Sequence, residues 1–331
     1  MNLRRRDFIT LVGGAAAWPL AAQAQQRDRV RRIAFLHYGA GENEPGWPPQ
    51  RTAFLEELAR LGWIEGRNLR IDFRYGAGDV GRMGAIAAEL VRSSPDVIVT
   101  AGNAATRALQ QATQTIPIVM AAGGDTVVTG MARNLARPEG NVTGFSTYEG
   151  SIGGKWLELL KAAAPHLTRA ALLYEPDAGV MAPSYIAAAG AAALTLSVET
   201  VAIPVRDAFD IVRAVDTFAT APNGGLVFLP VARAGMLEVM FRLTQQYRLP
   251  AIYQGLAAAR AGGLISYGTD TVELFRRAAS YVDRLLRGAK VNELPVEFPT
   301  KFQLVVNLKA AKAIGLTIPE SLLSRADEVI E

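Results

Sequence analysis

The sequence predicts an α/β fold with two similarly built lobes, each holding a parallel sheet with helices on both faces. Three observations support this prediction. Short apolar runs alternate with helix-like segments along the chain, which is typical of parallel sheets with helical connections. The 331 residues are enough for two domains of about 150 residues each. Residues 96–125 and 225–255 also share one order of apolar strand, turn, helix, aliphatic-Pro and apolar strand.

The first half of the chain contains five strand signals with helical patterns between them. Gly62 is expected to end the first helix, and Pro95 closes the second, because both residue types interrupt a helical backbone. A Gly/Pro-rich loop at 39–49 follows the first strand. The expected strands are 32–38, 68–75, 96–101, 116–122 and 141–147, and the expected helices are 50–62, 80–93 and 104–114.

The same alternation restarts after residue 150. Ser151 is expected to cap a helix that Pro165 ends. The tail at 294–316 is expected to hold one or two short extended pieces and a last helix. The other expected helices are 152–164, 184–196, 208–220, about 234–247 and 271–287, and the expected strands are 169–175, 197–203, 224–230, 250–255 and 262–268.

The N-terminus has the order of a secretory signal peptide. Arg4-Arg5-Arg6 is a basic start, residues 8–22 form a short apolar run, and Ala22-Gln23-Ala24 is a small-x-small cleavage site. The basic segment with Asp7 and the residues after it also resembles the twin-arginine export motif. We therefore expect residues 1–24 to be a signal peptide cleaved near Ala24, and the mature protein to be soluble, monomeric and periplasmic. An amphipathic tail is the alternative interpretation.

The composition excludes several kinds of chemistry. A formal net charge of +4 gives no case for nucleic-acid binding. Cysteine is absent, which excludes disulfides, thiol nucleophiles and thiolate metal sites, and there are only two histidines. An exported protein also has no ATP or NAD pool available. We therefore expect neither a metal nor a cofactor.

Small residues connect the strand at 96–101 directly to the next helix. Ligands of parallel sheets bind beyond the carboxyl ends of the strands, where a helix directs unpaired N–H groups and a partial positive charge. Residues 100–105 are therefore a candidate anion site suited to a carboxylate. The alternative is a plain turn in which small residues allow close packing. The turn lacks the second glycine of a dinucleotide fingerprint, and residues 149–156 lack the Ser/Thr of a phosphate loop.

Aromatic and acidic residues gather near the predicted strand ends. This pattern predicts a cleft with flat apolar walls and a few acids, suited to an organic ammonium or an amino acid. Edge packing is the alternative for each aromatic residue. His37 either lines the same cleft or is a partly buried polar residue. The tyrosines are Tyr38, Tyr148, Tyr174, Tyr253 and Tyr267, and the acids are Asp125, Glu175 and Asp270.

Several longer motifs resemble one family throughout nearly all of the mature chain. The two most specific are "LARPEGNVTG" and "VVNLKAAKAIGLTIP", and others include "FLEELARLGWIEGRNLRIDFRY", "TIPIVMAAGGD", "KWLELLKAAAP" and "AGGLISYGTD". In these segments the chain resembles the substrate-binding proteins of ABC transporters, in the group that includes tryptophan- and tyrosine-binding periplasmic proteins.

The resemblance implies two Rossmann-like lobes joined by a three-strand hinge, the type I periplasmic binding protein fold. The first lobe would comprise residues 30–146 and about 269–293, and the second residues 147–268 and about 294–331. The lobes would close on a small organic solute, such as an amino acid or an aromatic or carboxylate compound. The expected partners are a permease and an ATPase at the inner membrane, and no catalysis is expected.

The resemblance also implies ligand contacts on several loops. By position they are Tyr38, Gly39, Gly102, Asn103, Ala104, Asp125, Glu175, Pro230, Tyr253 and Asp270. Two of these turns depart from the family pattern. Many relatives have Thr-Pro or Ser-Pro where this chain has Gly102-Asn103, and Asp-Pro where it has Asp125-Thr126.

Two other functions stay open on the sequence. One is an exported hydrolase that uses an acid pair drawn from Asp125, Glu175 and Asp270. The other is a sensor subunit that presents its ligand to a membrane receptor. Turnover of a bound ligand would identify the hydrolase.

Overall fold

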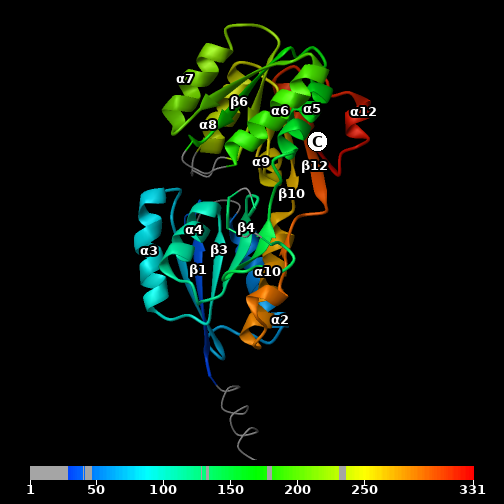
Figure 1. The fold of residues 1–331 in the computed structure, drawn as a ribbon. Coiled ribbons are helices and arrows are strands. Elements are labelled where there is room, and N and C mark those ends of the chain that lie inside the picture. Colours follow the sequence, from blue (N-terminus) through cyan, green and yellow to red (C-terminus); the bar gives the residue numbers. More distant parts are fainter. Residues whose placement is uncertain are drawn as a thin grey trace, which may run out of the picture.

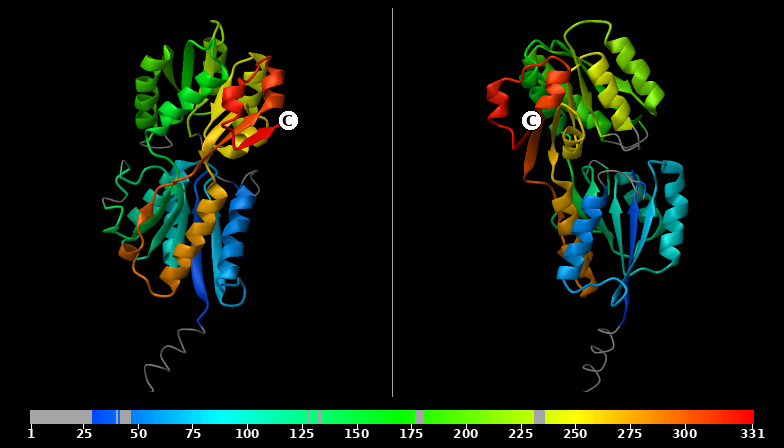
Figure 2. Two further views of the ribbon diagram at one scale, coloured as in Figure 1. Left: turned by 90° about the vertical axis from the view of Figure 1, so that its right-hand side faces the viewer. Right: turned by 180° about the vertical axis from the view of Figure 1, so that it is seen from behind.

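The computed structural model contains two α/β lobes stacked end to end (Figures 1 and 2). It describes residues 29–39, 41, 47–127, 129–131, 134–176, 181–230 and 236–331. The expected signal peptide at 1–24 lies outside these residues. Two sheets, one in each lobe, confirm the predicted fold class.

The first lobe is built on an entirely parallel sheet of six strands in the order β11-β5-β4-β3-β1-β2. Each expected strand of the first half is present within a few residues of its expected bounds. The strands are β1 (Arg31–His37), β2 (Leu69–Tyr75), β3 (Val97–Ala101), β4 (Ile118–Gly123), β5 (Val142–Ser146) and β11 (Val296–Glu297).

Helices cover both faces of this sheet because both faces of its strands are apolar. Along β1, Ile33 and Phe35 face the core beneath α2 and α10, whereas Ala34 and Leu36 face the core beneath α3 and α4. The helices are α2 (Trp47–Arg60), α3 (Val80–Arg92), α4 (Asn103–Ala112) and α10 (Thr271–Leu286), with a short 3-10 turn, η2 (Val291–Glu293), after α10.

The second lobe has a seven-stranded sheet in the order β13-β12-β10-β9-β8-β6-β7. Among the described strands of this sheet, only the β10–β12 pair is antiparallel. The strands are β6 (Arg169–Tyr174), β7 (Glu199–Pro204), β8 (Gly224–Phe228), β9 (Ala251–Tyr253), β10 (Ile265–Thr269), β12 (Phe302–Asn307) and β13 (Glu328–Ile330).

The described part of the second lobe has two helices more than the sequence predicted. The five-residue α9 is too short to show a helical period, and the tail holds two short helices instead of one. Ser151 precedes α5 as expected, but its side chain makes no capping hydrogen bond. The helices are α5 (Ile152–Ala163), α6 (Ala182–Leu196), α7 (Ala208–Phe218), α8 (Met236–Gln246), α9 (Leu256–Arg260), α11 (Leu308–Ala313) and α12 (Glu320–Leu323).

Three crossing segments join the lobes, on the side of the molecule where α10 and β12 lie in Figure 1. They run from β5 to α5, from β10 to α10 and from β11 to β12. The third crossing begins after Glu297. The reason is that β11 pairs with β5 in the first sheet, with Val296 opposite Gly144.

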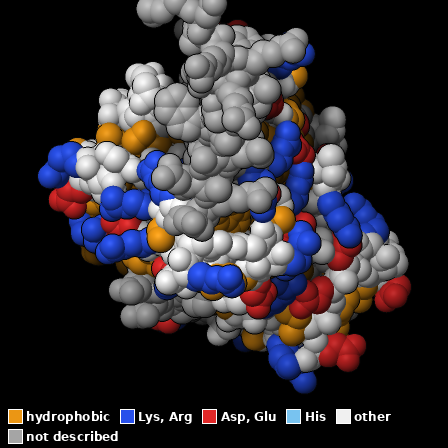
Figure 3. Space-filling model, turned by 90° about the horizontal axis from the view of Figure 1, so that it is seen from below, with side chains coloured by type: hydrophobic (Ala, Val, Ile, Leu, Met, Phe, Trp, Pro, Cys, Tyr) orange, Lys and Arg blue, Asp and Glu red, His pale blue; other side chains and the backbone are white. Residues whose placement is uncertain are grey.

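The surface of the first lobe that faces away from the second carries both signs of charge. Lys and Arg side chains are interspersed with Asp and Glu among the described residues in Figure 3. In the described part of the chain, no helix has the length and apolar content needed to span a bilayer.

Candidate functional site

The first-lobe candidates meet at one edge of the first sheet. Tyr38 and Gly39 follow β1, Gly102 and Asn103 follow β3, and Asp125 lies just after β4. These three strands are neighbours in the order β4-β3-β1. The turns are also joined by hydrogen bonds, because the Tyr38 amide donates to the Ala101 carbonyl at 2.9 Å and the Gly102 amide to the Ala122 carbonyl at 2.7 Å.

Gly102 is required where β3 turns into α4. Its φ of +97° lies in the region that favours glycine, and a Cβ built there would lie only 2.8 Å from Cβ of Tyr38. A larger residue would therefore both strain the backbone and displace Tyr38 from its buried position.

The N-terminus of α4 has no side-chain cap and no acidic residue in its first turn. Its first amide groups have no acceptor within the helix, and the helix dipole adds a partial positive charge there. Asn103 strengthens this donor set, because its Oδ1 accepts from the Gly124 amide at 2.8 Å while its Nδ2 keeps two hydrogens to donate. The arrangement suits a carboxylate.

The turn after β4 is held rigidly by its own hydrogen bonds. Oδ1 of Asp125 accepts from the Val127 amide at 2.9 Å, and the Asp125 carbonyl accepts from the Thr129 hydroxyl at 2.8 Å. The hydroxyl of Thr126 is fully buried and has no hydrogen-bond partner among the described residues. Asp125 therefore presents a fixed negative charge beside an unsatisfied hydroxyl.

The start of α6 brings the second lobe against this edge. A Cβ built on Gly124 would lie 2.7 Å from Cγ of Met181 and 2.8 Å from Nδ2 of Asn103. Burial, and then the nearby charge of Asp125, raise the pKa of the Tyr185 hydroxyl, so it stays protonated and able to donate. Met181, Tyr185 and Gly124 were not singled out from the sequence, and only Gly124, next to the end of β4, lies at a strand end that could have indicated it.

The second-lobe candidates have mixed environments. Glu175 follows β6 and is buried, with 2% of its surface exposed, and Pro230 lies half-buried two residues after β8. Asp270 is exposed and caps α10, accepting from the amides of Val272 and Glu273 at 2.9 and 3.3 Å. Glu175 and Pro230 thus stay candidates, whereas Asp270 has a structural task.

Tyr253, which was expected to contact the ligand, packs in the core of the second lobe. Its ring stacks on Phe228 at 5.0 Å and meets Phe241 edge-on at 5.4 Å, and only 2% of its surface is exposed. Two more of the strand-end tyrosines also have packing partners. Tyr148 meets Trp156 edge-on at 5.7 Å, and Tyr267 stacks on Phe302.

His37 is held neutral at the end of β1. Although its side chain keeps partial exposure, desolvation by its surroundings lowers its pKa to about 4. Among the described residues, no cluster of three or more His, Asp or Glu side chains is placed to hold a metal ion.

Two surface pockets lie away from the meeting point of the lobes. One of about 400 Å³ lies between β7 and α7, and another of about 460 Å³ is lined by residues 134, 137–140 and 290–292. Neither is lined by residues of both lobes. The candidate site is therefore defined by the strand ends and the contacts across the lobes.

Comparison with known proteins gives matches along most of the chain. The family model described as ABC transporter substrate binding protein matches residues 43–330. The tyrosine-binding protein of Clostridioides difficile (strain R20291) is 24% identical over 274 residues, which cover 82% of this chain and 78% of that protein.

Two solved structures share the whole architecture. An ABC domain from Streptococcus pneumoniae in complex with L-Trp is 25% identical with a TM-score of 0.82, covering 91% of this chain and 99% of that one. A conserved domain protein from Vibrio cholerae is 27% identical with a TM-score of 0.82, covering 91% of this chain and 100% of that one.

Proposed function

This chain belongs to the ABC transporter substrate-binding protein family, and on that premise we propose that it is the periplasmic receptor of an ABC importer. It captures a small organic solute that carries a carboxylate, either an amino acid or an aromatic carboxylate compound, and holds it between the lobes. It then delivers the solute unchanged to a permease and its ATPase at the inner membrane.

The observation that carries this proposal is the uncapped N-terminus of α4 at the carboxyl edge of the first sheet. A carboxylate there accepts from the free amides of the first turn and from Nδ2 of Asn103, and it neutralises the positive end of the helix. Tyr38, Gly39 and Ala104 lie around the same turn and complete the proposed first-lobe contacts.

Acidic residues supply the opposite pole of an amino acid. Asp125 lies on the turn after β4, and Glu175 is a buried carboxylate at the end of β6 in the second lobe. An ammonium group between the lobes would be attracted by both charges. The tyrosine-binding relative and the structure in complex with L-Trp support an amino acid with an aromatic side chain as the first ligand to test.

Matched compounds test the two poles separately. Calorimetry should measure the binding of L-tryptophan and, as a second amino acid, L-tyrosine. It should also measure tryptamine, which lacks the carboxylate, and indole-3-propionate, which lacks the ammonium group. A ligand present at about 100 times its dissociation constant should add roughly 2.7 kcal/mol to the free energy of unfolding. We expect tryptamine to bind far more weakly than the carboxylates. Failure of every carboxylate in a broad solute panel to stabilise the protein would contradict the proposal.

Turnover and uptake distinguish the remaining alternatives. A hydrolase would convert the bound compound, whereas we expect the compound to be recovered intact after prolonged incubation. Loss of solute uptake in a deletion strain is expected of an importer component, whereas a sensor subunit would change signalling and leave uptake intact.

Export through the N-terminal segment is also part of the proposal. We expect mass spectrometry of the periplasmic protein to give an N-terminus near Gln25. The mature form should sediment as a soluble monomer. If the twin-arginine route is used, replacing Arg5 and Arg6 together by lysine should block export. Unchanged export of that double variant would indicate the other secretion route.

A further inference from the structure

The three crossing segments must bend together if the lobes open and close. They are separate in sequence, at residues 147–151, 270 and 298–301, between elements that belong to different sheets. Three independent flexible connections would allow the lobes to twist and slide. Rotation of the two lobes about a single axis requires that the three segments be tied to one another.

One side-chain cluster ties all three segments on the first-lobe side. Arg277 and Tyr281 lie on α10, the helix that follows the second crossing, and Glu297 is the last residue of β11 before the third. Arg277 forms an ion pair with Glu297. The Tyr281 hydroxyl lies 2.6 Å from Oε1 of Glu297 and 2.9 Å from the Pro295 carbonyl, and its one proton is shared between them.

Phe145, near the end of β5, brings the first crossing into the same cluster. Its ring lies 4.7 Å from the ring of Tyr281, and the guanidinium of Arg277 lies 4.7 Å above it. The pairing of β5 with β11 places Phe145 directly opposite Glu297. We call Phe145, Arg277, Tyr281 and Glu297 the hinge cluster.

The second-lobe ends of the first two crossings are also held by hydrogen bonds. The Tyr148 hydroxyl donates to the Gln254 carbonyl at 2.6 Å, and Nε1 of Trp156 donates to the Tyr267 carbonyl at 2.8 Å. On the first-lobe side, the Thr147 amide donates to the Gly123 carbonyl at 2.6 Å. Bending is thereby confined to three short places, which are the 147–148 link, the 269–270 link and residues 298–301.

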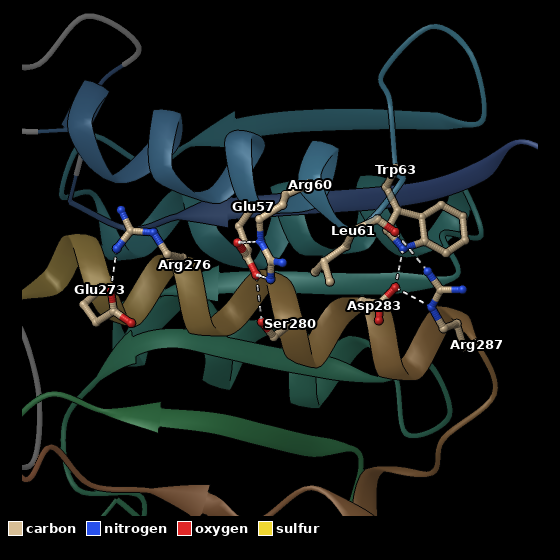
Figure 4. A network of polar contacts seen from close by, with 9 residues as sticks. All are labelled: Glu57, Arg60, Leu61, Trp63, Glu273, Arg276, Ser280, Asp283 and Arg287. Atoms are coloured by element: carbon tan, nitrogen blue, oxygen red, sulfur yellow. Dashed lines mark hydrogen bonds and ion pairs between the residues drawn. The ribbon is translucent and has the colours of Figure 1, made fainter.

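A second polar network joins α10 to α2 and to the residues that follow α2 (Figure 4), and its Asp283–Arg287 part lies at the end of α10 that is distant from the second crossing. Oδ1 of Asp283 accepts from Nε of Arg287 at 2.6 Å and from Nε1 of Trp63 at 2.8 Å. Glu57 on α2 pairs with Arg60 and lies 3.3 Å from the Ser280 hydroxyl. Arg287, the C-cap residue of α10, therefore offers a control, because like Arg277 it pairs with a carboxylate and lies over an aromatic ring, that of Trp63.

We propose that Arg277, Tyr281 and Glu297 are positioning residues that join the three crossing segments into one pivot for lobe closure. They touch no ligand in the proposed site. The importance of closure for capture rests on the proposed function, but the pivot itself is a property of the chain without ligand.

The absence of cysteine from the chain allows a direct measurement. Spin labels at Ala88→Cys on α3 and Thr217→Cys on α7, both exposed helical positions, report one distance between the lobes by double electron–electron resonance. Glu297→Gln, Arg277→Gln and Tyr281→Phe are measured in this background, with Arg287→Gln as the matched control. Thermal unfolding is recorded for each variant.

We expect the hinge-cluster variants to broaden the distance distribution and to shift its mean. Arg287→Gln should lower the unfolding temperature and leave the distribution as in the wild type. Unchanged distributions in Glu297→Gln and Arg277→Gln, or an equal change in Arg287→Gln, would overturn the proposal. If either charge variant fails to fold, the milder Tyr281→Phe, which keeps the ring on Phe145, decides between the same two results. No ligand is added, so failure of the proposed function would leave this result intact.

Discussion

Replacing Asn103 by aspartate should separate the stability of the fold from its capacity to bind an anion. The new carboxylate keeps the acceptor for the Gly124 amide, now 2.8 Å from Oδ1, and places a negative charge at the uncapped N-terminus of α4. Such a charge stabilises a helix by about 0.5 kcal/mol. Asn103→Ala instead leaves the Gly124 amide without its acceptor, which should lower stability by about 1 kcal/mol.

The order of the two variants in ligand affinity should be the reverse of their order in stability. A ligand carboxylate roughly 4 Å from a carboxylate at position 103 is repelled by about 4 kcal/mol at an effective dielectric constant of about 20. That energy corresponds to a loss on the order of several hundred-fold in Kd. Asn103→Ala loses one hydrogen bond to a charged group, about 2 kcal/mol or roughly 30-fold.

Urea denaturation measures the stability of the three proteins, and calorimetric titration of the same preparations measures their ligand affinity. We expect Asn103→Asp to be at least as stable as the wild type and yet to bind carboxylate ligands most weakly of the three proteins. Equal affinity of wild type and Asn103→Asp for a carboxylate ligand would refute the assignment of the anion site to α4.

Three further predictions concern stability. Gly144→Ala should destabilise by about 3 kcal/mol in urea denaturation, because φ is +128° and the new Cβ would lie 2.1 Å from the Met120 carbonyl oxygen; a loss under 1 kcal/mol would contradict this. His37 has a folded pKa of about 4 against 6.5 unfolded, so its contribution is present above pH 6.5 and is lost as the pH falls toward 4. Its partial exposure reduces this contribution to about 2 kcal/mol, and His37→Asn should remove that part of the pH dependence measured by urea denaturation at pH 7 and pH 4.5. Tyr253→Ala should lower the unfolding free energy by about 3–5 kcal/mol and leave the Kd for the ligand unchanged below the melting temperature of the variant. Weaker binding with normal stability would instead indicate that Tyr253 contacts the ligand.

Most strand positions were predictable because burial on both faces makes the central strands nearly continuous apolar runs. The β3–α4 junction shows how far this argument extends. Val97 to Ala101 are all buried, and the small residues that follow start the next helix within two positions of Ala101. From that order alone, parallel topology brings the turns after β1, β3 and β4 to one edge.

Side-chain direction at strand ends was not predictable from the same pattern. Ile252 and Tyr253 are neighbours on β9, but they enter different cores on opposite faces of the sheet. Because both faces are covered by helices, an aromatic residue at a strand end satisfies either core, and the sequence contains no polar alternation to choose between them. The cleft role expected of Tyr253 came from its position alone.

Contacts across the lobes depend on how the lobes are placed, which local sequence does not encode. Met181 and Tyr185 come close to the Gly124–Asp125 turn only because three distant crossings set the position of α6. The tail was expected to hold one or two short extended pieces, and β11 is one of them, but the local sequence did not show that it joins the first sheet. Val296 and Glu297 are too few to show a period, and pairing with β5 alone makes them a strand.

Native mass spectrometry of the exported, mature chain tests the central claim most directly. Wild-type protein purified gently from its host should carry one small solute with a carboxylate, which is released intact on denaturation, and Asn103→Asp should carry none. A chain that retains no solute, or a molecule held equally by both proteins, would contradict the claim that a carboxylate is bound at α4 between the lobes.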